Sequence, residues 1–314
     1  MVFASVNASD IRISDKLRAQ VEHRGAAGSA WLAGLPATIA RLETAWDMKV
    51  GRGYGSGTEA YTAEAVLADG TEAALKLPIA GLEKGAREAR MLDAAGGQGY
   101  VRLLRWDPET NAMLLERLGV QLHQLGLPME RQIEIICALL RKAWRQPPSG
   151  LELLTGAEKA AAMAAYIETV WNKLGRPCSD RTYDTALRFL SERRDAFDPK
   201  TAVMAHGDAH AWNTLQDPKA NGFKLVDPDG LFIERAHDLS ISMREWSVEL
   251  EPDPVARGRE RCALLSRLTG VDVEPIWQWG LIERLVNGLS YLEVGPTEYA
   301  PQFLTVAQAW AHAS

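Results

Sequence analysis

The sequence has few cysteines, and they form no recognisable motif. Cys137, Cys178 and Cys262 are the three cysteines among 314 residues, and they lie far apart. An odd and sparse set of this kind excludes a disulfide scaffold and a zinc module built on cysteine. It fits a protein of a reducing compartment, so we expect a cytoplasmic location.

The sequence also lacks long apolar segments and a surplus of positive charge. No apolar run approaches the roughly 20 residues that a membrane-spanning helix requires, and the first residues have neither region of a signal peptide. Lys and Arg number 35 against 41 Asp and Glu, which gives a net charge of −6. Because nucleic-acid binding depends on a cationic surface, we expect neither nucleic-acid nor membrane partners. The balance is compatible with a cationic small substrate.

Hydrophobic residues make up 46% of the chain, which is enough to bury a sizeable core. Helical spacing of apolar residues predicts two N-terminal helices, over about 15–23 and 28–45. Pro36 lies within the second, where it predicts a kink or a break. The sequence therefore begins, after a loose stretch, with helical structure.

The pattern changes to strands after these helices. Alternating apolar residues and a hairpin turn signal at Ala68-Asp69-Gly70-Thr71 make residues 46–118 read β-β-β-α-β-β. Beyond residue 118, most of the chain has the apolar periodicity of helices. We therefore predict an α+β protein with a small, sheet-rich N-lobe over residues 1–118. The larger, mainly helical C-lobe covers residues 119–314.

The strongest motif is His206-Gly207-Asp208-Ala209-His210-Ala211-Trp212-Asn213. Asp227 comes fourteen positions after Asn213, at the end of a short apolar strand. A single acid in a loop could be a turn former, but two acids and an amide beside strand-like runs indicate a metal–phosphate site. Magnesium prefers such hard oxygen ligands together with phosphate oxygens. In this interpretation Asp208 accepts the proton of an attacking hydroxyl, and Asn213 and Asp227 hold the metal.

Two further elements suit a bound phosphate chain. Lys76 lies in the middle of an apolar strand, and Glu88 on the next helix can hold its ammonium group as an ion pair. Taken alone, the two residues are better interpreted as a surface lysine and a solvated glutamate, but the presence of the other motifs reverses this preference. The glycine-rich stretch 51–57 would let backbone amides approach phosphate oxygens, with Gly53, Gly55 and Ser56 as the binding residues. It matches neither a Walker A loop nor a dinucleotide-binding turn.

Other polar residues have competing interpretations. His206 and His210 are four residues apart, as in a helical zinc site, but Gly207 argues against a helix and favours a structural role for His206. Asp238 opens a helix and is expected to be a cap or a loop anchor rather than a catalytic group.

Candidates for the acceptor site lie further along the chain. Glu245 and Trp246 could receive a cationic substrate, although packing explains the pair equally well. Glu283 shares a helix face with Asn287 and is a further candidate. The tryptophans at 144, 171, 277 and 279 are expected in the core.

The order of these motifs resembles the protein-kinase-like fold. It runs from the glycine-rich loop through Lys76, Glu88, the linker Leu114-Leu115-Glu116-Arg117-Leu118 and His-Gly-Asp to Asp227-Pro228-Asp229-Gly230. The His-Gly-Asp and Asp-Pro-Asp forms are similar to those of the aminoglycoside phosphotransferases. The linker and the N-terminal helices resemble the streptomycin 6-kinase and hydroxyurea-kinase branch. Ala209 and Ala211-Trp212 depart from the residues common at these positions, which affects the shape of the acceptor side.

The resemblance implies a bilobal kinase that uses ATP and Mg²⁺. Asp208 would be the catalytic base, Asn213 and Asp227 the metal ligands, and Lys76 the phosphate-binding lysine with Glu88 as partner. The backbone of Glu116 and Leu118 would hold the adenine edge. The implied acceptor is a small molecule, first of all a cationic aminoglycoside antibiotic such as streptomycin. Hydroxyurea, a peptide antibiotic or a metabolite alcohol remain as alternatives, as do a nucleotide-binding pseudoenzyme and a zinc metallohydrolase.

Overall fold

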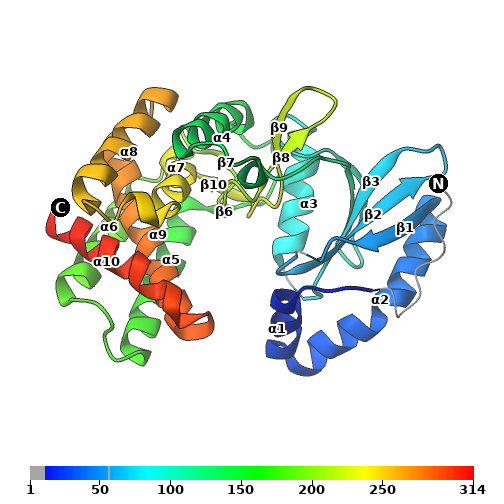
Figure 1. The fold of residues 1–314 in the computed structure, drawn as a ribbon, viewed down its shortest axis with the longest axis horizontal. Coiled ribbons are helices and arrows are strands. Elements are labelled where there is room, and N and C mark those ends of the chain that lie inside the picture. Colours follow the sequence, from blue (N-terminus) through cyan, green and yellow to red (C-terminus); the bar gives the residue numbers. More distant parts are fainter. Residues whose placement is uncertain (1–10, 56, 82) are drawn as a thin grey trace. The chain divides into compact units, whose positions relative to one another are not determined.

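The computed structural model describes residues 11–314, except residues 56 and 82. The chain divides into two compact units, Met1–Gly119 and Val120–Ser314. Figure 1 draws the first unit in blue to cyan and the helices of the second in green to red.

The first unit is built around an antiparallel sheet. Its elements are α1 (Asp15–His23), α2 (Gly25–Trp46), β1 (Met48–Gly53), β2 (Ala60–Leu67), β3 (Glu72–Pro78), α3 (Glu83–Ala95), β4 (Leu103–Asp107) and β5 (Ala112–Glu116). The five strands lie in the order β1-β2-β3-β5-β4. The predicted β-β-β-α-β-β order is therefore confirmed.

Helix α2 runs through Pro36 without ending, so of the kink or break predicted there, a break does not occur. A proline inside a helix removes one backbone hydrogen bond. Leu35 and Ile39 on either side of it are buried in the same apolar core as Val50 and Leu75 of the sheet. Packing of this face on the sheet holds the helix together, because tertiary burial outweighs a local propensity.

The second unit is mainly helical. Its helices are α4 (Met129–Ala143), α5 (Gly156–Lys173), α6 (Asp180–Asp195), α7 (Arg235–Arg244), α8 (Pro254–Thr269), α9 (Val273–Val294) and α10 (Ala300–His312), with short 3₁₀ turns at Leu122–Leu125, Ser247–Glu249 and Thr297–Tyr299. Helix α9 packs against α5, α6, α7, α8 and α10. It is accordingly buried along most of its length, including Trp277 and Trp279.

Short strands frame the segment that carries the strongest motif. They are β6 (Leu154–Thr155), β7 (Val203–Ala205), β8 (Thr214–Asp217), β9 (Gly222–Leu225) and β10 (Leu231–Ile233). Strand β10 pairs with β6 and β7, whereas β8 and β9 form a separate hairpin. Residues 206–213 thus connect a strand of one small sheet to the first strand of the hairpin.

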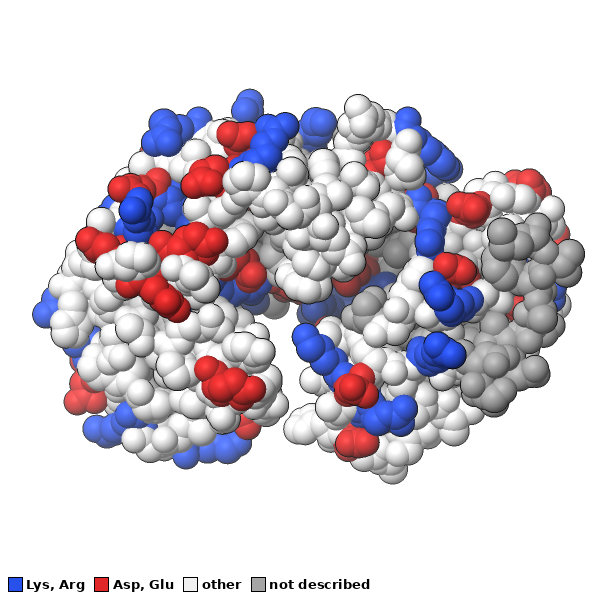
Figure 2. Space-filling model, viewed as in Figure 1, with Lys and Arg blue, Asp and Glu red and all other residues white. Residues whose placement is uncertain are grey.

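Acidic and basic side chains are interspersed on the face drawn in Figure 2. Within the described ranges, no helix is long and apolar enough to cross a bilayer.

Candidate functional site

Lys76 and Glu88 form a buried ion pair in the first unit. Lys76 lies in β3, paired with Thr62 of β2 and Met113 of β5, and Glu88 lies in α3. The Lys76 Nζ is 2.6 Å from both carboxylate oxygens of Glu88. Only 7% of Lys76 and 3% of Glu88 is exposed. The predicted ion pair is confirmed, and it fixes the direction of the ammonium group.

The glycine-rich stretch begins in the sheet. Gly53 ends β1, and a Cβ there would lie 3.0 Å from both the Arg12 carbonyl oxygen and a ring carbon of Tyr61, so a larger residue would force these neighbours to move by a few tenths of an ångström. Gly55 has a φ of +67°, a conformation that side chains disfavour. Ser56 lies outside the described residues. The role of this stretch in phosphate binding stays a prediction.

The linker residues Glu116 and Leu118 lie at and just beyond the end of β5. The Glu116 amide donates to the Arg102 carbonyl at 3.0 Å, while its side chain accepts from the Arg102 amide at 2.8 Å. Leu118 is buried, with 8% of the residue exposed. The contact of both residues with an adenine edge also stays a prediction.

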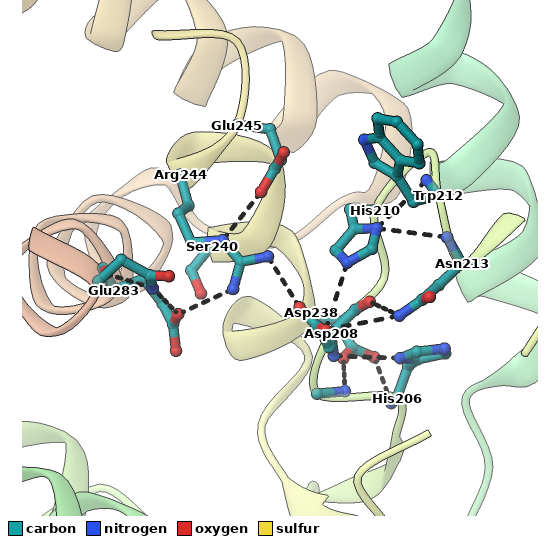
Figure 3. A network of polar contacts seen from close by, with 12 residues as sticks. His206, Asp208, His210, Trp212, Asn213, Asp238, Ser240, Arg244, Glu245 and Glu283 are labelled. Atoms are coloured by element: carbon teal, nitrogen blue, oxygen red, sulfur yellow. Dashed lines mark hydrogen bonds and ion pairs between the residues drawn. The ribbon is translucent and has the colours of Figure 1, made fainter. Parts of the chain in front are cut away.

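The loop over residues 206–213 is anchored by a buried carboxylate of α7 (Figure 3). Asp238 Oδ1 accepts from the Gly207 amide at 2.7 Å. Its Oδ2 accepts from the His206 amide at 3.0 Å and from the Trp144 indole at 2.8 Å. Burial raises the pKa of Asp238, and these hydrogen bonds act in the opposite direction. Asp238 is thus a loop anchor, as predicted.

Gly207 is required by both conformation and space. Its φ is +87°, and a Cβ would lie 2.8 Å from Asp229 Cβ and 2.9 Å from a methyl carbon of Leu231. Glycine alone adopts such a φ at low cost. The small residue therefore permits the turn that presents Asp208.

His206 and His210 have structural hydrogen bonds at both ring nitrogens. His206 Nδ1 accepts from the Asp208 amide at 3.0 Å, and Nε2 lies 2.8 Å from the Val226 carbonyl oxygen. His210 Nδ1 accepts from the Trp212 and Asn213 amides, and Nε2 is 3.3 Å from Asp208 Oδ2. Both imidazoles therefore carry their proton on Nε2. No ring lone pair is left for zinc, which disfavours a metallohydrolase.

Asn213 and Asp227 lie at the open end of the β8–β9 hairpin, one just before its first strand and the other just after its second. Asn213 directly precedes β8, and the Val226 amide beside Asp227 donates to the Asn213 carbonyl at 2.9 Å. Asn213 Nδ2 donates to the Asp208 carbonyl oxygen at 3.1 Å and lies 3.5 Å from Asp208 Oδ2. Asp227 has a left-handed φ of 60°. These contacts place the side chain of Asn213 beside Asp208, and the backbone next to Asp227 beside Asn213.

The donor set of this neighbourhood fits magnesium. Because Nδ2 of Asn213 donates to the Asp208 carbonyl oxygen, Oδ1 of Asn213 would be the atom to bind a cation, and Asp227 would add a carboxylate. Among the described residues, no three His, Cys, Asp or Glu side chains gather as a metal site by themselves. Magnesium typically has one or two protein ligands, and phosphate oxygens and water molecules complete its coordination.

Asp208 lies at one end of a network of charged groups (Figure 3). Arg244 Nη2 donates to Asp208 Oδ1 at 2.8 Å, Nε donates to Glu245 at 2.9 Å, and Nη1 is 3.5 Å from Glu283. Burial acts to raise the pKa of Asp208, but Arg244 and His210 outweigh it, so this pKa lies well below its usual range. Asp208 is therefore an ionised carboxylate at neutral pH.

Two of the predicted acceptor residues, Glu245 and Glu283, thus lie in the same network as Asp208. Burial raises the pKa of Glu283, and Arg244 opposes this effect. The third, Trp246, begins a 3₁₀ turn with a φ of 51°, and its carbonyl accepts from Arg261 at 3.2 Å. The guanidinium carbon of Arg261 also lies 5.9 Å from the centroid of the Trp246 ring, so the backbone and the ring of Trp246 both lie beside Arg261.

Sequence reasoning missed Arg244 and misjudged Trp144. Arg244 ends a helix that is otherwise buried over Ala236–Met243, and a cation at the end of so buried a helix is the signal that could have identified it. Trp144 is only partly buried, and its indole N–H donates to the buried Asp238 carboxylate. Trp171, Trp277 and Trp279 are core residues as predicted.

Trp212 is a large residue beside Asn213. It is 53% exposed, and its ring stacks on His123, with 3.3 Å between the ring centroids. The Gln121 side chain donates to its carbonyl at 3.0 Å. Trp212 is thus held by its neighbours while one side of its ring meets solvent.

Known proteins are similar to this chain in sequence and fold. Residues 47–295 match the family described as aminoglycoside/hydroxyurea antibiotic resistance kinase. A streptomycin 6-kinase of Streptomyces griseus is 32% identical over 91% of this chain and 92% of its own length. A hydroxyurea phosphotransferase of Kitasatospora aureofaciens is 29% identical over 94% of this chain and 84% of its own. A choline kinase structure from Streptococcus pneumoniae aligns with a TM-score of 0.60 and 15% identity, over 90% of this chain and 100% of that one.

Proposed function

Because this chain belongs to the aminoglycoside/hydroxyurea antibiotic resistance kinase family, we propose that it transfers the γ-phosphoryl group of ATP to a hydroxyl of streptomycin or a related aminoglycoside. In this reaction the acceptor oxygen forms a bond to the γ-phosphorus, and the bond from that phosphorus to the bridging oxygen of ADP breaks. The acceptor proton passes to a base. The products are a phosphorylated, inactive antibiotic and ADP.

Asp208 is the base in this proposal. Its low pKa keeps the carboxylate ionised at neutral pH and able to accept the proton. Its side chain is 30% exposed, so an acceptor hydroxyl can reach it. A loose transition state for phosphoryl transfer requires a well-placed group more than a strong base.

Asn213 and Asp227 would hold magnesium through their side-chain oxygens. When bound, this ion would neutralise negative charge on the phosphates of ATP. Lys76 would contribute a second positive charge to the phosphates, with its ammonium group directed by Glu88. Gly53, Gly55 and Ser56 would supply backbone amides, and Glu116 and Leu118 would contact the adenine.

The charge beside Asp208 favours a cationic acceptor. Glu245 and Glu283 join Asp208 around the single guanidinium of Arg244. Three carboxylates outnumber Arg244 and Lys159, the Arg and Lys side chains that act on Asp208 and Glu283, and an excess of negative charge attracts a positively charged substrate. This observation favours an aminoglycoside over uncharged hydroxyurea. The latter stays the second candidate because of the hydroxyurea phosphotransferase among the relatives.

A mass-spectrometric screen tests the proposal. The protein is incubated with ATP and Mg²⁺ and a panel of streptomycin, other aminoglycosides, hydroxyurea, peptide antibiotics and simple alcohols. We expect streptomycin or another aminoglycoside to gain the mass of one phosphoryl group. A product from hydroxyurea alone would favour the second candidate. ATP binding without any product over the whole panel would indicate a nucleotide-binding pseudoenzyme instead.

A further inference from the structure

Arg244 joins three carboxylates that come from three parts of the second unit. Nη2 contacts Asp208 of the loop at 2.8 Å, Nε contacts Glu245 next to it at 2.9 Å, and Nη1 contacts Glu283 of α9 at 3.5 Å. The Arg244 side chain is only 12% exposed. Three different nitrogens are used, one for each carboxylate.

This arrangement depends on the shape of a guanidinium group. Its nitrogens lie in one plane and point in fixed, divergent directions, so a single arginine can orient several carboxylates at once. A lysine has one nitrogen on a flexible stem and cannot span the same three positions. Removal of the cation would also leave Asp208 and Glu283 as like charges that repel each other.

Arg244 is itself held by a rigid part of the fold. Its partner Glu283 is 7% exposed on α9, where Asn287 Nδ2 donates to the Glu283 carbonyl oxygen at 2.9 Å. His237 of α7 is fully buried, and its Nε2 lies 3.7 Å from the Glu283 carboxylate. Groups held by packed helices position a site more accurately than groups on loops alone.

We propose that Arg244 is a positioning residue, which fixes the Asp208 carboxylate for the acceptor hydroxyl; this inference rests on the role proposed above for Asp208. Arg244 holds Oδ1 while His210 lies 3.3 Å from Oδ2. The carboxylate is thereby constrained at both oxygens although it sits on a loop. Arg244 takes no proton and touches neither substrate in this role.

The test replaces Arg244 and separates positioning from stability. In Arg244→Ala we expect kcat to fall about 100-fold, the effect of a base displaced by roughly 1 Å. The KM for ATP should stay unchanged. Added guanidinium ion at millimolar concentration should restore part of kcat, whereas urea should not. A second variant without the guanidinium group, Arg244→Gln, should cause no further loss of kcat when Asp208 is already replaced by Asn. The reason is that Arg244 acts on kcat through Asp208, so the effects of the two substitutions are not additive.

Arg284 offers a matched control. It is a fully buried arginine of α9 that donates to the Met243 carbonyl at 2.9 Å and to the Ser247 hydroxyl at 3.3 Å. Its remaining hydrogen bonds go to the carbonyl oxygens of Gln302 and Glu245, so it holds backbone rather than the Asp208 carboxylate. Because the Met243 and Glu245 carbonyls flank Arg244, Arg284→Gln should lower the stability of the protein and displace Arg244 without removing it, so the folded fraction should lose far less kcat than Arg244→Ala. Equal losses of kcat in the Arg244 and Arg284 variants would overturn the proposal.

Arg244→Lys keeps the test decisive if Arg244→Ala does not fold. It retains a cation beside Glu283 but cannot span all three carboxylates, so we expect a reduced kcat with an unchanged KM for ATP. Wild-type kcat in folded Arg244→Lys or Arg244→Ala would overturn the proposal. Full turnover by Asp208→Asn would instead contradict the proposed role of Asp208 as the base. This result distinguishes a failure of the proposed function from a failure of the proposed role of Arg244.

Discussion

Asp238 carries a prediction that the structure allows to be worked out in detail. Its two oxygens accept three hydrogen bonds, one at Oδ1 from Gly207 and two at Oδ2 from His206 and Trp144. Asp238→Asn conserves size but replaces one oxygen by an NH₂ group. Whichever way the amide turns, at least one buried N–H donor then faces another donor.

The cost can be worked out from these hydrogen bonds. An unsatisfied buried donor costs about 1–3 kcal/mol, and hydrogen bonds to a charged acceptor are worth about 1.5–3 kcal/mol each. We therefore expect Asp238→Asn to lower the free energy of unfolding by about 2–4 kcal/mol. Because the same bonds hold the backbone before Asp208, kcat should fall as well, by roughly 100-fold for a 1 Å displacement.

Urea unfolding and steady-state kinetics measure the two effects. Trp144→Phe is the control, since it removes one donor and leaves Asp238 bonded to the loop amides. It should cost about 1.5–3 kcal/mol, the value of one hydrogen bond to a charged acceptor, and should leave kcat near that of the wild type. An Asp238→Asn protein as stable and as active as the wild type would refute the role of Asp238 as loop anchor.

Three other perturbations probe the same geometry. Gly207→Ala should destabilise the protein by at least about 2 kcal/mol and abolish most activity, because residue 207 has a left-handed backbone and the added Cβ would meet Asp229 and Leu231. A variant with the same thermal unfolding temperature as the wild type would contradict this. Glu88→Gln should lower the free energy of unfolding by about 3–5 kcal/mol and raise the KM for ATP, since it breaks a buried ion pair. Calorimetry measures the first effect and steady-state kinetics the second, and an unchanged KM would argue against the role of Lys76. Burial lowers the pKa of His237 well below its usual value, so below about pH 6.5 the unfolded chain takes up a proton that the folded chain does not, and stability falls with falling pH. When the pH falls from about 7.5 to 5.5, the free energy of unfolding of the wild type should therefore decrease by about 1.4 kcal/mol more than that of His237→Phe. Equal decreases in the two proteins would show that His237 is protonated in the folded protein.

Much of the first unit could be predicted because its signals are local. Alternating apolar residues define β2 and β3, and the turn at Asp69-Gly70 joins them. The ion pair of Lys76 and Glu88 could be predicted because a lysine within an apolar strand needs a partner. The continuity of α2 through Pro36 could not, since it depends on packing between elements.

The network around Asp208 was harder to predict. Asp208, Glu245 and Glu283 could be named as polar candidates, but no sequence spacing relates them, because α7 and α9 meet only in the folded unit. Arg244 lies next to Glu245 in the sequence, and its local signal is its place at the end of a helix that is otherwise buried. Its contacts with three carboxylates arise from the tertiary structure alone.

The proposed mechanism depends most directly on Asp208 as the acceptor of the hydroxyl proton. The measurement is transfer of radiolabelled γ-phosphate from ATP to streptomycin by the wild type and by Asp208→Ala, with nucleotide affinity determined in parallel. We predict that the variant binds ATP normally and loses transfer by several orders of magnitude, each factor of ten being about 1.4 kcal/mol of transition-state stabilisation. Undiminished transfer by Asp208→Ala would contradict this mechanism.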